Sequence, residues 1–420
     1  MSSRAFAGEL NSSVDSAHDA FGAAVLGVLS HRAATAGHLA EALRRDPSLA
    51  AVHAIRGFGL RSLGRRALLP DVRSHLSAGR ACLPDDPARG ARERALLDAL
   101  EAFLDDRGPE ASDLLERRLT VEPRDLLTAK LLHGARFMLG DAEGMLRGTE
   151  LALEGFDDAD PQRGWLLGCR AFARCELGEA ELAERDGHAA VERNRGDVWA
   201  IHAVAHARWA RHDHRGALEW LVAHRAPLDG GNNFSGHVAW HEALLWTELG
   251  RPDEALRAFD ARVAIYPTDD YREVSNACSL LYRLERRGVD VGARWDRWVA
   301  IARERSGDHQ SPFADAHFVL ALTERGLPGE ADRFIESLAR SVREHDEGHD
   351  ARVAREVGLP LARAIADGSP ARVRALLPAL SRMGGSRAQR ALFGWIASRG
   401  DTVRAGRAPA GAEACAWPTS

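Results

Sequence analysis

Apolar residues recur three and four positions apart along almost the whole chain, in segments of about 12 to 16 residues. This spacing places one apolar stripe along a helix and is typical of amphipathic α-helices. The alternation with a period of two that indicates β-strands is almost absent. The pattern therefore predicts an all-α chain.

Turn-like breaks separate the helices, and several fall at regular intervals. Gly140, Gly178 and Gly250 each follow a leucine, and the intervals between them are 38 and 72 residues. A further break at 211–213 divides the longer interval into two units near 36 residues. This period is close to the roughly 34 residues of a tetratricopeptide repeat, which is one helix–turn–helix hairpin.

We therefore predict a tetratricopeptide-like α-α superhelix, or solenoid, of about 20 helices that encloses a central pocket. Residues 16–401 are expected to form this single repeat domain, between a flexible N-terminus (1–15) and a disordered C-terminal tail (402–420). The predicted helical pairs lie at 50–83, 90–120, 126–154, 162–194, 197–225, 236–264, 272–304, 313–343 and 348–383, with a last helix near 386–398.

Two histidine pairs stand out against this regular background. His202 and His206 are four residues apart, and so are His237 and His241 in the next hairpin, where Trp240 precedes the last histidine. Residues four apart share one helix face, and stacked hairpins place equivalent helices side by side. The four imidazoles are therefore expected to meet in one patch, and the polar segment 226–235 between the pairs is placed to cover it.

Such a patch has three interpretations. Imidazoles at i and i+4 can chelate a divalent metal ion. Without metal, neutral imidazoles can act as general acids and bases. The third interpretation is structural, since buried histidines also fill space and bond to neighbours.

The segment 308–320 adds a second group of candidates. Asp315 and His317 are two residues apart, so they point in different directions on one helix. Asp308 or Asp315 could orient a histidine of the patch through its second ring nitrogen. Alternatively, Asp308 is a turn residue and Asp315 is a first-turn acid facing the helix dipole.

A third candidate lies near the C-terminus. Gly384-Gly385-Ser386 is typical of the end of one helix followed by the N-cap of the next. Backbone amides exposed there, together with Arg390, would suit an anionic group. The competing interpretation is an ordinary turn between helices.

Composition excludes several classes of chemistry. The net charge is −5 and there is no basic block, so nucleic acid is not an expected partner. No apolar run approaches the roughly 20 residues of a membrane span. The five cysteines are scattered without a CxxC motif, and the N-terminus has no apolar signal core, which favours a cytoplasmic location. Lys130 is the only lysine, and nucleotide and pyridoxal motifs are absent, which leaves a divalent metal as the cofactor to consider.

Ordered segments of the chain resemble the tetratricopeptide repeat protein 38 family, from about residue 20 to about 398. They are WAIHAVAH (199–206), HVAWHEAL (237–244), SNACSLLYRLERRGVDVGARW (275–295), FADAHFVLAL (313–322), REVGLPL (355–361) and GGSRAQR (384–390). The resemblance implies an all-α, repeat-like, intracellular protein, and it does not specify an activity. It places family motifs on His202, His206, His237, Trp240, His241, Asp315, His317, Glu356, Gln389 and Arg390, and suggests one enclosed pocket. Gly134 departs from the family, which tends to carry an acid there.

Two functions remain open from the sequence. One is an enzyme that acts on a small anionic molecule, with the histidines, Trp240, Asp315 and His317 in catalysis and Glu356, Ser386, Gln389 and Arg390 in binding. The alternative is a scaffold that binds a peptide or partner protein in a concave groove, the usual task of such arrays. The substrate, the metal and the oligomeric state are not specified by the sequence.

Overall fold

The computed structural model describes residues 3–8, 10–266, 270–344 and 347–403, and within them only the backbone of 399–403. The chain divides into two compact units, unit one (Met1–Thr268) and unit two (Asp269–Ser420). The described residues form helices, connecting loops and one isolated β-bridge. None of these helices combines the length and the apolar character needed to cross a membrane.

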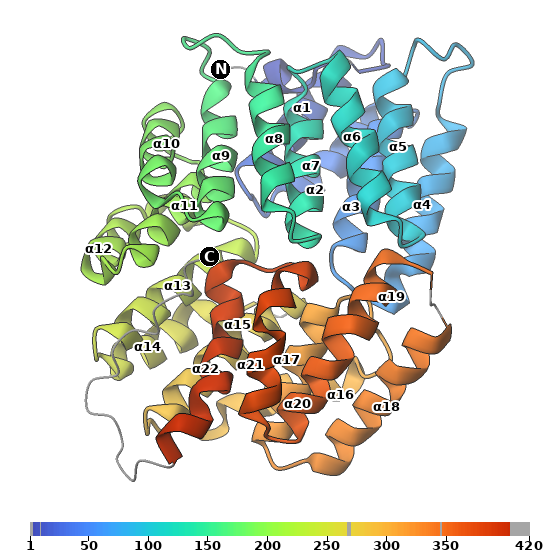
Figure 1. The fold of residues 1–420 in the computed structure, drawn as a ribbon. Coiled ribbons are helices and arrows are strands. Elements are labelled where there is room, and N and C mark those ends of the chain that lie inside the picture. The colour runs from blue at the N-terminus through green and yellow to red at the C-terminus, as the bar shows by residue number, and fades with distance from the viewer. Residues whose placement is uncertain (1–2, 9, 267–269, 345–346, 404–420) are drawn as a thin grey trace. The chain divides into compact units, whose positions relative to one another are not determined.

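Unit one consists of helices α1 to α14 (Figure 1). Their bounds are α1 Asp15–Leu29, α2 Thr35–Arg45, α3 Ala50–Arg61, α4 Leu69–Ala81, α5 Ala91–Leu104, α6 Gly108–Val121, α7 Leu126–Met138, α8 Ala142–Leu153, α9 Arg163–Leu177, α10 Ala180–Arg193, α11 Val198–Ala210, α12 His214–Ala223, α13 Phe234–Glu248 and α14 Pro252–Ala258, followed by a π-helical turn, Phe259–Val263.

Consecutive helices in unit one pack as antiparallel hairpins. Helix α10 packs against its partner α9 and also against α11 of the next hairpin, while α9 and α11 contact each other directly. This arrangement, in which each hairpin packs on the next, is that of tetratricopeptide-like arrays. The prediction of an all-α, tetratricopeptide-like fold is confirmed.

The predicted breaks are helix ends, marked by residues in a left-handed conformation and by a side-chain cap. Gly140, Gly178 and Gly250 have φ of 70°, 87° and 72°, a left-handed conformation that glycine adopts without steric cost. At the break predicted for 211–213, His212 takes this conformation instead, with φ 60°. The next residue, Asp213, caps α12 by accepting a hydrogen bond from the Gly216 amide.

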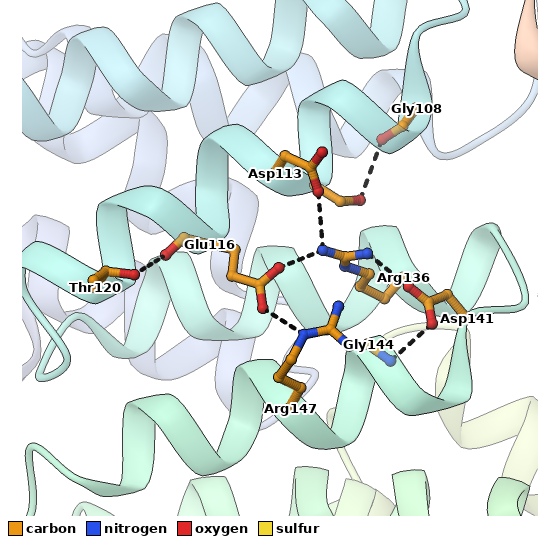
Figure 2. A network of polar contacts seen from close by, with 9 residues as sticks. Gly108, Asp113, Glu116, Thr120, Arg136, Asp141, Gly144 and Arg147 are labelled. Carbon is orange, nitrogen blue, oxygen red and sulfur yellow. Dashed lines mark hydrogen bonds and ion pairs between the residues drawn. The ribbon is translucent and has the colours of Figure 1, made fainter.

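A polar network ties three helices of unit one together, as Figure 2 shows. Arg136 of α7 donates hydrogen bonds to Asp113 and Glu116 of α6 and to Asp141, which caps α8. Arg147 of α8 donates to the second oxygen of Glu116 at 3.0 Å. Since Arg136 is buried, these carboxylates supply the counter-charges that its burial requires.

The turn between α1 and α2 reaches a segment far along the chain. Arg32 forms a β-bridge with Gly231, and its guanidinium donates to the Pro227 carbonyl at 2.9 Å. The Asn232 amide donates to the His31 carbonyl at 2.8 Å. The first hairpin therefore holds the segment that precedes α13.

Unit two consists of helices α15 to α22 (Figure 1). Their bounds are α15 Tyr271–Arg286, α16 Asp296–Glu304, α17 Pro312–Glu324, α18 Pro328–Glu344, α19 His349–Val353, α20 Leu359–Ala366, α21 Pro370–Leu376 and α22 Arg387–Val403. A π-helical turn, Ala354–Gly358, joins α19 to α20, and a 3₁₀ segment, Leu377–Met383, follows α21. Helix α17 lies at the centre, in contact with α15, α16, α18 and α20, and its inner residues are fully buried.

The predicted helical pairs coincide with the observed ones within a few residues, but one hairpin was not assigned. Helices α1 and α2 form a further pair ahead of residue 50. In the segment expected to be flexible, a 3₁₀ turn spans Ser3–Phe6, and Phe6 and Ala7 are buried. The chain divides into two compact units, and the prediction that residues 16–401 form a single domain stays a prediction. Of the predicted tail, 402–420, the residues from 404 onward lie outside the described part of the chain.

Candidate metal centre

Four histidines of unit one meet between two consecutive hairpins. His202 and His206 lie on α11, which begins after Asp197, whose side chain accepts a hydrogen bond from the Ala200 amide. His237 and His241 lie on α13. His202, His206 and His241 are buried, whereas His237 is partly exposed. The convergence predicted from the two i, i+4 spacings is present in the structure.

The four rings direct the same nitrogen toward one another. The Nε2 atom of His202 lies 2.8 Å from that of His206, 3.0 Å from that of His237 and 3.1 Å from that of His241. The Nε2 atoms of His237 and His241 are 3.2 Å apart. We call this group the histidine cluster.

The cluster cannot satisfy all of its close contacts by hydrogen bonding. A neutral imidazole has one N–H donor and one acceptor nitrogen, so each close pair requires one nitrogen that donates and one that accepts. The Nε2 atom of His202 faces three others and can complete only one such bond as a donor. Its Nδ1 atom is also buried and has no hydrogen-bond partner in the described structure.

Burial keeps two of these imidazoles, those of His202 and His206, neutral. Burial, reinforced by the neighbouring histidines, lowers the pKa of His202 well below its ordinary value. Burial, with a smaller contribution from His237, lowers the pKa of His206 to about 3. Both rings therefore carry free lone pairs at neutral pH and need not lose a proton to bind a metal ion.

The donor set and its spacing fit a transition-metal ion. Imidazole nitrogen suits zinc, copper, nickel and iron. Zinc–nitrogen bonds of about 2.0–2.1 Å in a tetrahedron place the ligand atoms about 3.4 Å apart. Four of the six Nε2 pairs are 2.8–3.2 Å apart, a few tenths of an ångström shorter, and all four ligand atoms lie within 4.8 Å of one another, so a small rotation of the rings would seat an ion.

Aromatic rings surround the cluster and fix its imidazoles. Phe172 of α9 stacks on His202 with ring centroids 5.5 Å apart. Phe234 stacks on His237 at 5.4 Å, and Trp240 stacks on the same ring at 5.3 Å. The Nε1 atom of Trp240 is buried and has no hydrogen-bond partner in the described structure. Trp240 therefore packs on His237, and its catalytic role stays a prediction.

Several neighbours of the cluster were missed in the sequence. Trp199 and Phe234 each lie three residues before the first histidine of a pair, and both contact His202, with ring centroids 5.4 Å and 5.1 Å away. This repeated i−3 spacing is the signal that would have found them. His31, from the turn between α1 and α2, stacks on Phe234 at 4.4 Å, and no local pattern indicates it. Phe234 also confirms that segment 226–235 reaches the patch.

Two further residues of unit one bear on the surroundings of the cluster. The ammonium of Lys130 sits 4.3 Å from the ring centre of Trp199, a cation–π contact. Gly134, where the family that the sequence resembles tends to carry an acid, is exposed on α7, and an added Cβ there would meet no atom within 4 Å. An acid at Gly134 would therefore project into open space on the surface.

The remaining predicted site residues belong to unit two, and Asp315 has a different partner from the one expected. Its Oδ1 atom lies 3.2 Å from Nδ1 of His309, a residue that was not predicted, instead of pairing with a histidine of the cluster. Asp308, the other acid considered for this role, pairs with Arg305 at 2.7 Å. His317 is buried, and its Nδ1–H donates to the Phe313 carbonyl at 2.8 Å. Burial lowers the pKa of His317 to about 4.

The predicted anion site at the start of α22 is occupied by contacts within the chain. The Ser386 amide donates to Oε1 of Gln389 at 2.9 Å, and the Gln389 amide donates to Oγ of Ser386 at 3.3 Å. This reciprocal arrangement is a capping box, and both residues are buried. Arg390 donates to the carbonyls of Gly384 and Gly385. The amides of Ser386 and Gln389 are therefore not exposed as expected, and the binding of an anion at this turn stays a prediction.

Glu356 lies on the surface of unit two. It forms an ion pair with Arg382 at 2.5 Å, and both side chains are about half exposed, at 48% and 45%. Nothing in its described surroundings encloses it, so its expected place in a pocket is not observed. The single central pocket that would join all predicted residues stays a prediction.

Fold and site together define an all-α, tetratricopeptide-like repeat protein with a histidine cluster. No family model matches the chain. Among solved structures, the chain is similar to yeast Tom70, with a TM-score of 0.36 and 12% identity over 86% of this chain and 90% of that chain. It is also similar to the tetratricopeptide repeat domain of P58(IPK), with a TM-score of 0.24 and 13% identity over the same shares. At these scores the fold assignment rests on the hairpins themselves.

Proposed function

We propose that this protein is a tetratricopeptide-like scaffold for a peptide or protein partner, and that its histidine cluster binds one divalent transition-metal ion. The observation that carries the metal proposal is the convergence of four Nε2 atoms, two from α11 and two from α13. An ion bound there would fasten two consecutive hairpins. The stacked hairpins favour a scaffold, since such arrays present extended surfaces to partners.

Acid–base catalysis by the cluster is the less favoured interpretation. A general base works best when its pKa lies near the operating pH. Burial lowers the pKa of His206 to about 3, and the Nε2 atoms of His202 and His206 face imidazoles rather than a carboxylate. Four Nε2 atoms that face one another suit a cation better than a proton shuttle.

Metal-assisted catalysis is the second candidate, and the exposure of His237 favours it. His237 is the one member of the cluster that is partly exposed. If it gave up its place to a water molecule, three histidines would hold the ion with an open position, as in catalytic zinc sites. A small anionic substrate remains the class that this second candidate would use.

The resemblance in sequence also supports membership of the tetratricopeptide repeat protein 38 family and a cytoplasmic location, which we propose on that ground.

The decisive experiment is metal analysis of untagged protein after incubation with zinc and removal of excess ion. We expect about one zinc ion per chain and none in His206→Ala/His241→Ala. A matched control is His53→Ala/His75→Ala, which removes two other histidines whose Nδ1 atoms are 3.2 Å apart, and which should keep the ion. Equal zinc content in all three proteins, or none in the wild type with zinc, copper or nickel, would contradict the proposal.

Stability and turnover separate the two metal-dependent candidates. At zinc concentrations about 1,000 times the Kd, binding to the folded state should add about 4 kcal/mol to the free energy of unfolding. A scaffold predicts this gain without hydrolysis of an activated phosphoester. A catalytic centre predicts chelator-sensitive hydrolysis of the phosphoester that His206→Ala/His241→Ala abolishes.

A further inference from the structure

Unit two contains a group of reactive side chains of its own. The Nε2 atom of His309 lies 3.0 Å from Oγ of Ser337 on α18. Its other nitrogen, Nδ1, lies 3.2 Å from Oδ1 of Asp315 on α17. A carboxylate accepts a hydrogen bond, so Nδ1 carries the proton and Nε2 offers a lone pair to the serine hydroxyl. These are the contacts of a serine–histidine–aspartate triad.

The imidazole of this group is held in place. The side chains of His309 and Asp315 are each only 2% exposed. The His309 ring meets Phe334 edge-on, with centroids 5.2 Å apart. The backbone of His309 has φ 43°, a left-handed conformation that is uncommon outside glycine. Such outliers concentrate where the surrounding structure fixes a functional side chain.

The serine is placed where a substrate can reach it. Ser337 is partly exposed in the middle of α18, unlike its two buried partners. Arg333 and Arg340 are exposed on the same helix, four residues before and three residues after Ser337. Residues at these spacings are neighbours on a helix surface. The two arginines therefore lie on the same side of α18 as Ser337, and their positive charge would favour a substrate that carries negative charge.

We propose that Ser337 is an activated nucleophile that cleaves small carboxylic esters bearing an anionic group, an activity beyond the proposed metal-binding scaffold. Ser337 Oγ bonds to the ester carbonyl carbon while its proton passes to Nε2 of His309. The carbon–oxygen bond to the leaving alcohol breaks, and that oxygen takes the proton from His309. Water then attacks the acyl group on Ser337, gives a proton to His309, and releases the carboxylic acid as the proton returns to Oγ.

His309 is the catalytic base in this scheme, because it touches the reacting hydroxyl. Asp315 is a positioning residue, because it acts through His309. It fixes the ring with Nδ1 protonated and stabilises the imidazolium that forms during the attack.

The proposal is tested by labelling the full-length protein with a fluorophosphonate probe, in which Ser337 Oγ displaces fluoride from phosphorus. Mass spectrometry should place one label on Ser337, and Ser337→Ala should abolish it. His309→Asn, chosen because asparagine tolerates the left-handed conformation, should slow labelling at least ~100-fold. Ser341→Ala, one turn further along α18, should label like the wild type. An unlabelled wild type, or equal labelling of His309→Asn, would overturn the proposal.

Asp315→Asn distinguishes positioning from a structural role. We expect a lower maximal labelling rate with an unchanged half-saturating probe concentration and an unchanged melting temperature. A change confined to the melting temperature would overturn the role given to Asp315. For substrate class, p-nitrophenyl hemisuccinate should be cleaved faster than p-nitrophenyl acetate, and Arg333→Ala/Arg340→Ala should remove that preference. Equal rates for both esters in the wild type would overturn the anionic class.

Discussion

The histidine cluster of unit one and the group around His309 in unit two are both largely buried, but they differ in what each imidazole faces. In the cluster, every Nε2 atom lies 2.8–3.2 Å from at least one other Nε2 atom. In unit two, one nitrogen of His309 faces a carboxylate and the other faces a hydroxyl. In the cluster, nitrogens of the same kind face one another. In unit two, each nitrogen of His309 faces a group that can complete a hydrogen bond with it.

This difference determines what each site can do. A histidine held between a carboxylate and a hydroxyl can take the proton of that hydroxyl while the oxygen attacks a substrate, as the proposed ester cleavage requires. Lone pairs that converge on one point require something from outside, and a cation is the simplest answer. Burial alone therefore does not distinguish the two sites, whereas the partners that each imidazole faces do.

The largest expected effect comes from breaking a complementary pair in unit one. Arg92 and Asp125 are buried and share two hydrogen bonds, of 2.9 and 2.8 Å. Burial alone would raise the pKa of Asp125, but the charge and hydrogen bonds of Arg92 hold it below its ordinary value. Asp125→Leu should cost about 3–5 kcal/mol, because it leaves a buried guanidinium without its counter-charge.

The matched comparison is His206→Leu in chelator. This variant should lower the free energy of unfolding by no more than about 1.5 kcal/mol, since it removes a neutral ring whose Nε2 atom faces another Nε2 atom. Urea denaturation measures both variants. Similar losses in the two proteins would show that the cluster is as well paired as the Arg92–Asp125 contact, which is the opposite of our interpretation.

Acid should destabilise both units through their buried neutral histidines. Burial lowers the pKa of His133 to about 3 in unit one and that of His317 to about 4 in unit two, from an ordinary value of 6.5. Below pH 6.5 the unfolded chain takes up protons that the folded chain cannot, so stability falls with decreasing pH. Each histidine should contribute about 1.4 kcal/mol per pH unit until its folded pKa is reached.

Replacing either histidine by phenylalanine should make this pH dependence shallower by about one proton. At about pH 7.5 the two variants should differ, because neither nitrogen of His133 has a hydrogen-bond partner in the described structure while His317 donates to Phe313. His133→Phe should leave the free energy of unfolding nearly unchanged, and His317→Phe should lower it by about 1 kcal/mol. Unfolding titrations from about pH 7.5 to about pH 5 provide the test, and an unchanged slope would refute the assignment.

The smallest effect concerns the predicted anion site in unit two. Ser386→Ala removes the hydroxyl of the capping box and should cost about 1 kcal/mol. Added phosphate should not change the free energy of unfolding of the wild type or of Ser386→Ala, because the amide of Ser386 already donates to Gln389. Glu356→Gln, which breaks an exposed ion pair, serves as the control and should leave the urea midpoint where it is. Phosphate-dependent stabilisation that Ser386→Ala removes would support the predicted anion site.

Local spacing predicted most of the fold and the location of the cluster. The apolar period of three and four, the left-handed glycines and the i, i+4 histidines are all short-range patterns, and each appears in the structure as expected. The capping box was also readable, since a serine followed three residues later by a glutamine marks a helix start. Short-range patterns failed where the partner is distant. Nothing near Asp315 indicates Ser337, and nothing near His31 indicates Phe234.

The bridge between the α1–α2 turn and the segment before α13 also bears on how the protein is made. Arg32 and Pro227, which share a hydrogen bond, are 195 residues apart in sequence. During synthesis the first hairpin leaves the ribosome long before its partner segment exists, so it must wait while most of unit one is translated. Because contacts of such high sequence separation form late, the join at His31 and Asn232 is where we expect the folding of unit one to finish.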